Sequence, residues 1–455
     1  MAPQLRKSTQ RARLLAGMVQ ATVERGYEGA NVSAVIARAR VSRPTFYDYF
    51  AAREACFLAA LEDLQEQMLE HASRVLVQAE PRGALAAVVG ALVDFAAQDP
   101  GAGRFLTAEA MTGGPAALAL RDDGIERLAT LVTAAEQHAA ASSPLPDVDA
   151  RVVLGSVHRM LAMRLRRGET RLQALGEALR AWVASYERPA RSRRWASLAY
   201  GPRPAPSAHV PATPIQRMPG VFGPGRPRVS EEEVVENHRL RILYAVARLA
   251  AERAYGGVLV GDIRRLARVD GQVFYRLFAD KQEAFAAAHE LGFQQVMDVT
   301  SKAFFSAAAW PERSWEAGRA LTELLDANPL IGTVGFVEAY AAGPETVQRV
   351  EDSHAAFMFF LQDGLVHSKR EPPPSREAME AIIAGVFEIV YLEARKSKPQ
   401  SARMLGYIAH LWLAPFLGAA ASDRFIQTRL ERESRRGRSA GKKAPRSRVK
   451  RGRAP

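Results

Sequence analysis

Apolar residues recur every three to four positions over most of the chain, which is the spacing of amphipathic helices. In the stretch 11–24 these residues are Leu14, Leu15, Met18 and Val19. Gly26 and Gly29 follow and would end this helix. Ser33 is placed to cap a second short helix, and Ser42 to cap a third with Pro44 in its first turn. The pattern therefore predicts three short helices near the N-terminus.

The third of these helices has one apolar face and one polar face. Phe46 and Phe50 lie four residues apart and would point inward, which leaves Arg43, Thr45, Tyr47 and Tyr49 outward. A short helix, a tight turn and a second short helix form the geometry that places a helix in the major groove of DNA. The stretch therefore predicts a helix-turn-helix.

The same pattern occurs twice along the chain. The run VSRPTFYDYF at 41–50 has a counterpart, VDGQVFYRLF, at 269–278, and the displacement of 228 positions needs no gap from Arg13 to Phe57. Later matches are displaced by 229 or 230 positions, and they include Gly155 with Gly385 and Trp182 with Trp412. Two copies of one unit, including the part beyond the helix-turn-helix, are the simplest interpretation.

The run RLLAGMVQATVERGYEGANVSAVIARARVSRPTFYDYFAAREACFLAAL resembles the DNA-binding head of the TetR/AcrR family of transcriptional regulators. Gly-Tyr after the first helix, Val-Ser before the third and Thr-Phe-Tyr-x-Tyr-Phe within it carry the resemblance. It implies an all-α, repressor-like protein in which a three-helix head precedes a larger body that senses an effector and dimerises. Arg40 departs from the family pattern, which usually has Gly in this turn, and Arg268 takes the same place in the second copy.

Carried over by this resemblance, the DNA-binding positions of the first head fall into two groups. Phosphate contacts would come from Ser33, Ser42, Tyr47, Tyr49 and Arg53. Base contacts would come from Arg43, Pro44 and Thr45.

The second head keeps the packing residues of the first but changes its outward surface. Asp270 can still cap the helix, although its charge repels phosphate. Gln272 is placed to read adenine, and Tyr275, Arg276 and Lys281 to hold the backbone. Two interpretations stay open: a second DNA reader, or a head that folds without binding.

Composition shifts along the chain divide it into six parts. The segment 189–229 contains nine of the 26 prolines and predicts an extended or disordered linker. The predicted parts are a head at 8–68 with its helix-turn-helix at 31–50, a body at 69–188, the linker at 189–229, a second head at 236–296 with its helix-turn-helix at 259–278, a second body at 297–424 and a basic disordered tail at 425–455.

The net charge of +13 is unevenly distributed. Residues 429–455 contain twelve Lys or Arg against two Glu, so the tail carries most of the excess. Residues 1–60 have nine basic and four acidic side chains, whereas 224–288 have eleven and nine. Double-stranded DNA is therefore the expected partner, bound more strongly by the first head than by the second. GPGRPR at 223–228 is either a minor-groove arm or simply a basic linker end.

Several classes of function are not indicated. The single cysteine, Cys56, fits a reducing cytoplasm, and no apolar run reaches the length of a membrane span. The nine histidines lack metal-ligand spacing, and neither a phosphate-binding glycine loop nor a nucleophile elbow occurs. We therefore expect no enzymatic activity, no cofactor, no metal and no membrane partner.

The bodies would carry a pocket for a small apolar effector if the resemblance extends to them. Candidate lining residues, although residues of this kind are more often plain core, are Phe95, Met111, Met160, Met163, Phe336, Tyr340 and Phe357. Family members dimerise through their last two body helices, so 150–167 and 171–187 would pack against 377–395 and 402–420 of the same chain. This predicts an intramolecular pseudo-dimer. The alternatives are a homodimer of the whole chain, or an adaptor in which only the first head or the basic tail contacts DNA.

Overall fold

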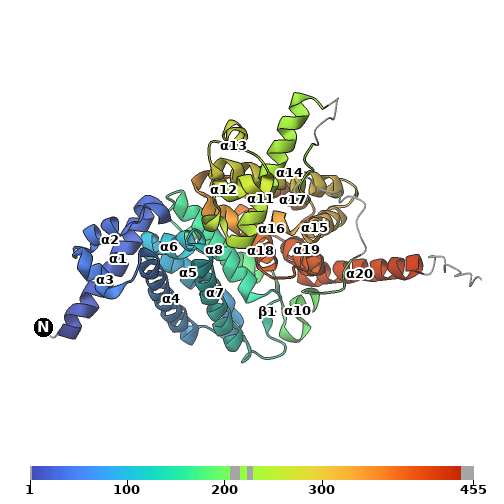
Figure 1. Ribbon diagram of the computed structural model, residues 1–455. Helices are drawn as coiled ribbons and strands as arrows, with labels where there is room; N and C mark the ends of the chain where they lie inside the picture. The colour runs from blue at the N-terminus through green and yellow to red at the C-terminus, as the bar shows by residue number, and fades with distance from the viewer. Residues whose placement is uncertain (1–2, 205–215, 223–228, 442–455) are drawn as a thin grey trace, which may run out of the picture.

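The computed structural model describes residues 3–204, 216–222 and 229–441, and most of them are helical, as the all-α prediction requires (Figure 1). The helices of the first half are α1 (Pro3–Gly29), α2 (Val32–Ala39), α3 (Arg43–Tyr49), α4 (Arg53–Gln78), α5 (Ala84–Gln98), α6 (Pro100–Thr107), α7 (Gly114–Glu136), α8 (Ala150–Arg166), α9 (Gln173–Ala184) and α10 (Trp195–Leu198). Short 3-10 turns are η1 (Pro81–Gly83), η2 (Glu109–Met111) and η3 (Ala190–Ser192). Strands β1 (Pro144–Pro146) and β2 (Glu187–Pro189) form one small antiparallel pair in which Leu145 lies opposite Arg188.

The second half repeats the order of elements. Its helices are α11 (Glu231–Arg253), α12 (Val260–Ala267), α13 (Gly271–Leu277), α14 (Lys281–Phe304), α15 (Trp310–Ala327), α16 (Pro329–Phe336), α17 (Pro344–Leu365), α18 (Arg376–Ala394), α19 (Leu405–Leu417) and α20 (Ala419–Gly441). Its 3-10 turns are η4 (Tyr255–Gly257), η5 (Glu338–Ala342) and η6 (Ser401–Met404).

Each half begins with a three-helix head, α1–α3 in the first and α11–α13 in the second. Phe46 and Phe274 are fully buried at equivalent positions of the third helices and pack the heads from inside. The turn before each third helix contains an arginine in the left-handed conformation, Arg40 at φ 52° and Arg268 at φ 51°. The glycine usual in this turn is therefore replaced without a change of turn geometry.

The kink that ends the first helix of each head is occupied by different residues. Gly26 has φ 72° and ψ 170°, a region of backbone conformation open almost only to glycine. At the equivalent place the second half has Ala254, with φ 59° and ψ 158°. The second head therefore carries backbone strain that the first head avoids.

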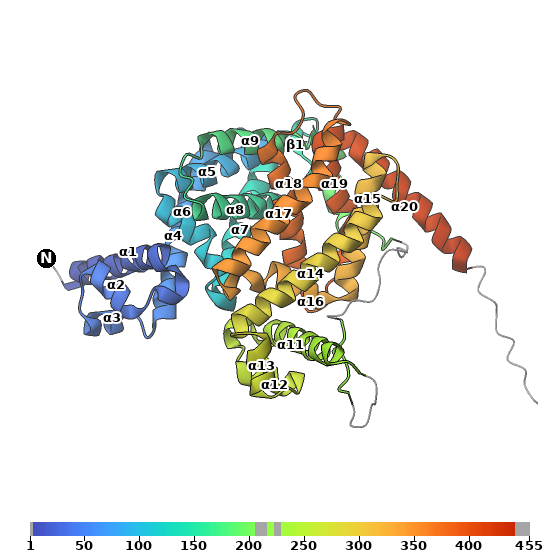
Figure 2. The ribbon, with the colours of Figure 1, turned by 90° about the horizontal axis from the view of Figure 1, so that it is seen from above.

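The two bodies meet along a seam made of α8 and α9 from the first half and α18 and α19 from the second. Figure 2 shows α8 and α18 near the centre of the molecule, the first head at its left and the second head at its bottom. Polar contacts cross the seam at several points. Ser156 donates to the carbonyl of Ala381 (2.7 Å), Tyr186 donates to the carbonyl of Leu411 (2.7 Å), and the Tyr407 hydroxyl accepts from the amide of Asp149 (2.9 Å).

The start of the predicted linker is ordered, so the expectation of an extended or disordered segment is wrong for 189–198. Trp195 and Leu198 of α10 supply apolar anchors, with the Trp195 ring 6.1 Å from that of Tyr407 and Leu198 buried. The Asp147 carboxylate accepts from the backbone amides of Arg194 and Trp195 and holds the segment to the first body. The proline-rich composition concealed these few anchoring residues.

The predicted disordered tail is also partly helical, because α20 continues to Gly441. Its first turns are attached to the body: Ile426 is fully buried, and the Arg188 guanidinium lies 3.4 Å from the carboxylate of Asp423. The tail beyond Gly441 and the GPGRPR stretch at 223–228 lie outside the described residues. Within the ranges that the structure does describe, no helix is both long and apolar enough to cross a membrane.

Candidate nucleic-acid interface

The third helix of the first head begins at a well-formed cap. The Ser42 hydroxyl accepts from the amide of Thr45 (3.2 Å) and lies 2.8 Å from its hydroxyl, which confirms Ser42 as the cap. The cap of α2 is Asn31, whose side chain accepts from the amide of Ala34 (2.9 Å), so the prediction that Ser33 caps this helix is wrong. Both residue types can cap a helix, and the helix begins two residues earlier than Ser33 would allow.

Ser33 is instead part of the outward surface of the head. The Arg43 guanidinium donates to the Ser33 hydroxyl over 2.8 Å, which joins the start of α3 to α2. Ser33, Ser42, Arg43 and Pro44 are exposed, and the Tyr47 side chain is 50% exposed. The structure therefore brings the hydroxyl, guanidinium and phenol groups of the predicted set together on one solvent-facing surface.

Two predicted phosphate contacts lie at the edge of this surface. Tyr49 is half-buried and donates to the side-chain carbonyl of Gln10 over 3.4 Å. The Arg53 guanidinium donates to the carbonyl of Tyr27 and stacks 4.2 Å from its ring centroid. Arg53 thus fastens α4 to the end of α1, and its role toward phosphate stays a prediction.

The second head has the same anchor with a different cation. Lys281 donates to the carbonyl of Val258 (3.0 Å) and lies 4.5 Å from the centroid of the Tyr255 ring. Asp270 caps α13 by accepting from the amide of Val273 (2.8 Å), as predicted. The remaining predicted contacts, Gln272, Tyr275 and Arg276, are all exposed, and Tyr275 is 59% exposed.

The sequence interpretation missed one cation on the second head. A side chain at Gly271 would come within 3.2 Å of the Arg264 guanidinium, so the absence of a side chain lets Arg264 lie over the start of α13. Gly271 stands where the first head has Arg43. Two differences between the copies were the signal in the sequence: Arg264 stands where the first copy has Ile36, and Gly271 stands where it has Arg43.

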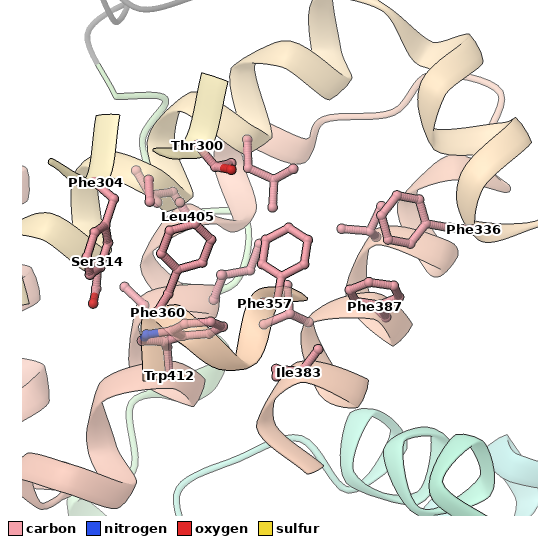
Figure 3. Close-up of a pocket in the computed structure, with 17 residues that line it drawn as sticks. Thr300, Phe304, Ser314, Phe336, Phe357, Phe360, Ile383, Phe387, Leu405 and Trp412 are labelled. Carbon is pink, nitrogen blue, oxygen red and sulfur yellow. The ribbon is translucent and has the colours of Figure 1, made fainter. Parts of the chain in front are cut away.

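A cavity in the second body lies near α14 (Figure 3). Its volume is about 40 Å³, and its walls are almost entirely apolar. Figure 3 shows the rings of Phe357, Phe360 and Phe387 around one space, with Trp412 beside them. Of the predicted pocket residues, Phe336 and Phe357 line it.

The other predicted pocket residues lie elsewhere. The Tyr340 hydroxyl accepts from Arg159 (2.9 Å) at the seam, away from the cavity lining. Met111, Met160 and Met163 are buried in the core, and Phe95 is half-buried against it. The first body has a smaller cavity of about 20 Å³, whose lining includes Arg121 and His158.

The outward face of α3, with its capped start and its exposed polar side chains, is that of a helix-turn-helix DNA-binding protein. Residues 14–60, which run from within α1 into α4, match the family model described as "Bacterial regulatory proteins, tetR family". No curated protein matches the chain. The match supports a DNA-binding transcription regulator and shows that residues 14–60 are similar to the tetR family.

Proposed function

We propose that the chain is a sequence-specific, ligand-responsive repressor in which two tetR-type units, duplicated in tandem, act as each other's partner. The observation that supports this proposal is the seam between α8 and α18, which joins two halves of one polypeptide that each carry a three-helix head (Figure 2). Helix-turn-helix dimers present their recognition helices to successive major grooves, roughly 34–36 Å apart. Here α3 and α13 would take those two places within a single molecule.

The proposed division of the chain follows the predicted boundaries, with heads at 8–68 and 236–296 and bodies at 69–188 and 297–424. Base reading is assigned to Arg43, Pro44 and Thr45, with Gln272 in the second head. Because α3 and α13 expose different side chains, the operator would be asymmetric. Footprinting that returns a perfect inverted repeat would contradict this part of the proposal.

Replacing Arg43 by Ala is expected to reduce affinity for the preferred sequence by about 1–3 kcal/mol, because a guanidinium that can bind a guanine edge is lost. Tyr47→Phe should weaken binding to preferred and random DNA alike, since it removes one phosphate contact. Fluorescence anisotropy on duplexes selected from a random pool measures both. Arg82→Ala is the matched control, because it removes an exposed cation from η1. An equal effect of Arg43→Ala on preferred and random DNA would argue against base reading.

The second body is the proposed sensor of a small apolar effector. Two elements connect its cavity to the second head. Helix α14 contributes Thr300 and Phe304 to the cavity lining and Lys281 to the head anchor. Phe336 lines the cavity only two residues before Glu338, whose carboxylate accepts from the amide of Tyr255 (2.7 Å). An effector that widens the cavity would therefore shift the second head and change the affinity for DNA.

Filling the cavity should abolish binding of an apolar probe. Ala409 lines the cavity, and the equivalent position of the first half holds the buried Leu179. Ala409→Leu is therefore expected to weaken binding of N-phenyl-1-naphthylamine at least about tenfold, a loss of about 1.4 kcal/mol or more. The control, Ala181→Leu, adds the same volume on an exposed face of α9. If Ala409→Leu binds the probe with unchanged affinity in a fluorescence titration, the probe binds outside this cavity.

An adaptor in which only the first head or the basic tail contacts DNA is the second candidate. The near balance of charge in 224–288 favours it over a second reader. A chain shortened to end at Gly441 tests the tail, because it retains every described element. Sequence-specific binding that survives this truncation and is lost in Arg43→Ala would exclude the tail as the reader. An additional loss of binding in Gln272→Ala would support the repressor over an adaptor that binds through the first head alone.

A further inference from the structure

One carboxylate sits at the centre of the seam and is surrounded by cations from the other half. Glu388 of α18 is fully buried. Its two oxygens accept from Arg121 (3.0 and 2.8 Å), and the guanidinium groups of Arg159 and Arg151 lie 2.8 and 3.3 Å away. Arg121 is also fully buried, so bulk water does not screen the charges of Glu388 and Arg121.

The backbone of the first half is shaped to admit this carboxylate. A side chain at Gly155 of α8 would lie 2.5 Å from the Glu388 carboxyl group, so only glycine permits the approach. The Tyr391 ring lies 5.0 Å from the Arg121 guanidinium and 5.1 Å from that of Arg159, which adds a further partner from the second half. The site is therefore built from cations of one half and an anion and a ring of the other.

This arrangement is not repeated by the internal symmetry of the chain. The position equivalent to Glu388 in the first half is His158, whose pKa is lowered by burial and by the neighbouring Arg121. The positions equivalent to the three arginines in the second half are Val350, Ala381 and Ile389, all buried and uncharged.

One carboxylate beside the centre has an equivalent in both halves. Asp122 of the first half contacts Arg395 of the second half at 3.1 Å, and it also contacts Arg121 (2.9 Å) and Arg151 (3.4 Å) of its own half. Its equivalent, Glu351, is bound by Arg166 (3.4 Å) and Arg167 (3.0 Å) of the first half. Because each half supplies this carboxylate, its ion pairs discriminate less between like and unlike pairs than Glu388 does.

We infer that Glu388 and its three arginines make the seam selective, so that a first half pairs only with a second half. Two first halves would bury three arginines on each side opposite His158. Asp122 would remain a partner for Arg121 and Arg151, but Arg159 would lose the carboxylate that it contacts at 2.8 Å. Two second halves would bury Glu388 against Val350, Ala381 and Ile389. A buried charge without a partner is strongly unfavourable, so both like pairs are suppressed. The partner that this surface fits is an unlike half of this same chain.

The experiment removes the advantage that the connecting chain gives to pairing within one molecule. A protease recognition sequence is inserted after Pro204, the full chain is purified and cut, and the pairs present after prolonged incubation are weighed by native mass spectrometry. We expect unlike pairs in the wild type. In Glu388→Leu, which lets two second halves pack without a buried charge, we expect like pairs to rise at least about tenfold.

Two further variants keep the outcome decisive. Replacing Glu388, Arg121, Arg151 and Arg159 together by Met restores an uncharged centre and should also yield like pairs if the single variant is too unstable to assemble. Glu351→Gln is the control and should leave the composition unchanged, because its ion pair has an equivalent on the other side. Like pairs in the wild type, or the same composition in wild type and both centre variants, would overturn the inference.

The inference rests on the proposed pairing within one chain and does not depend on DNA binding. Loss of sequence-specific binding with unlike pairs intact would count against the regulator alone. A random mixture of pairs with DNA binding intact would count against selectivity alone.

Discussion

Replacing Glu388 by Ala is expected to lower the free energy of unfolding by about 3–5 kcal/mol, because three buried or nearly buried guanidinium groups lose their common partner. The measurement is urea unfolding of the full chain followed by circular dichroism. The control is Glu66→Ala, which breaks an ion pair with Arg127 that is exposed on both sides and should lower stability far less. Equal losses in the two variants would mean that the buried network adds no more than a surface pair.

The same site gives a pH dependence with a defined sign. The arginines hold the pKa of Glu388 well below its usual range against the opposing effect of burial. A carboxyl whose pKa is lower in the folded chain stabilises the fold above its unfolded pKa of about 4.3. That contribution is lost as the pH falls from there through the folded value. The difference in stability between wild type and Glu388→Gln should therefore shrink on acidification, and no shrinkage would argue against an ionised Glu388.

Ala254→Gly is expected to raise the free energy of unfolding of the second head by about 1–2 kcal/mol. Its backbone occupies a region that costs a non-glycine residue about 1–3 kcal/mol, partly offset by the greater freedom of glycine in the unfolded chain, about 0.5–1 kcal/mol. Gly26→Ala should lower the stability of the first head by about 1–2 kcal/mol, because the same two effects act with opposite sign. Hydrogen exchange of the amides in α1 and α11 measures each head separately.

Gly83→Ala is the control for both substitutions, because Gly83 has an ordinary negative φ of −98° and no atoms near the added methyl group. Opposite signs at Gly26 and Ala254, with little change at Gly83, are the expected pattern. A loss of stability in Ala254→Gly would show that strain at the kink does not limit the second head.

Local features were predictable from the sequence because they depend on neighbouring residues. The cap at Ser42, the cap at Asp270 and the inward pair Phe46 and Phe50 all follow from spacings of a few positions. Ser33 was misassigned because Asn31, two residues earlier, is an equally good cap, and only the packing of α1 against α2 decides between them. The placement of Arg53 on the Tyr27 ring likewise depends on how α4 meets α1.

Features that join distant parts of the chain were not predictable in this way. Arg121 and Glu388 are separated by 267 positions, and each alone is an ordinary charged residue on a helix. Glu388 stands where the first copy has His158, and this difference between the copies does not say what faces the carboxylate. Of the predicted pocket residues, Phe336 and Phe357 line the apolar cavity. Tyr340 instead contacts Arg159 at the seam, and its sequence position alone does not distinguish the two locations.

The closure of the seam within one polypeptide also affects how the protein would respond to its own abundance. Separate subunits below their dissociation constant form dimers in proportion to the square of their concentration, so halving expression removes three quarters of the active species. When both halves are made on one ribosome, the competent form rises linearly with copy number. A cell that holds only a few molecules would lose none of them to dissociation.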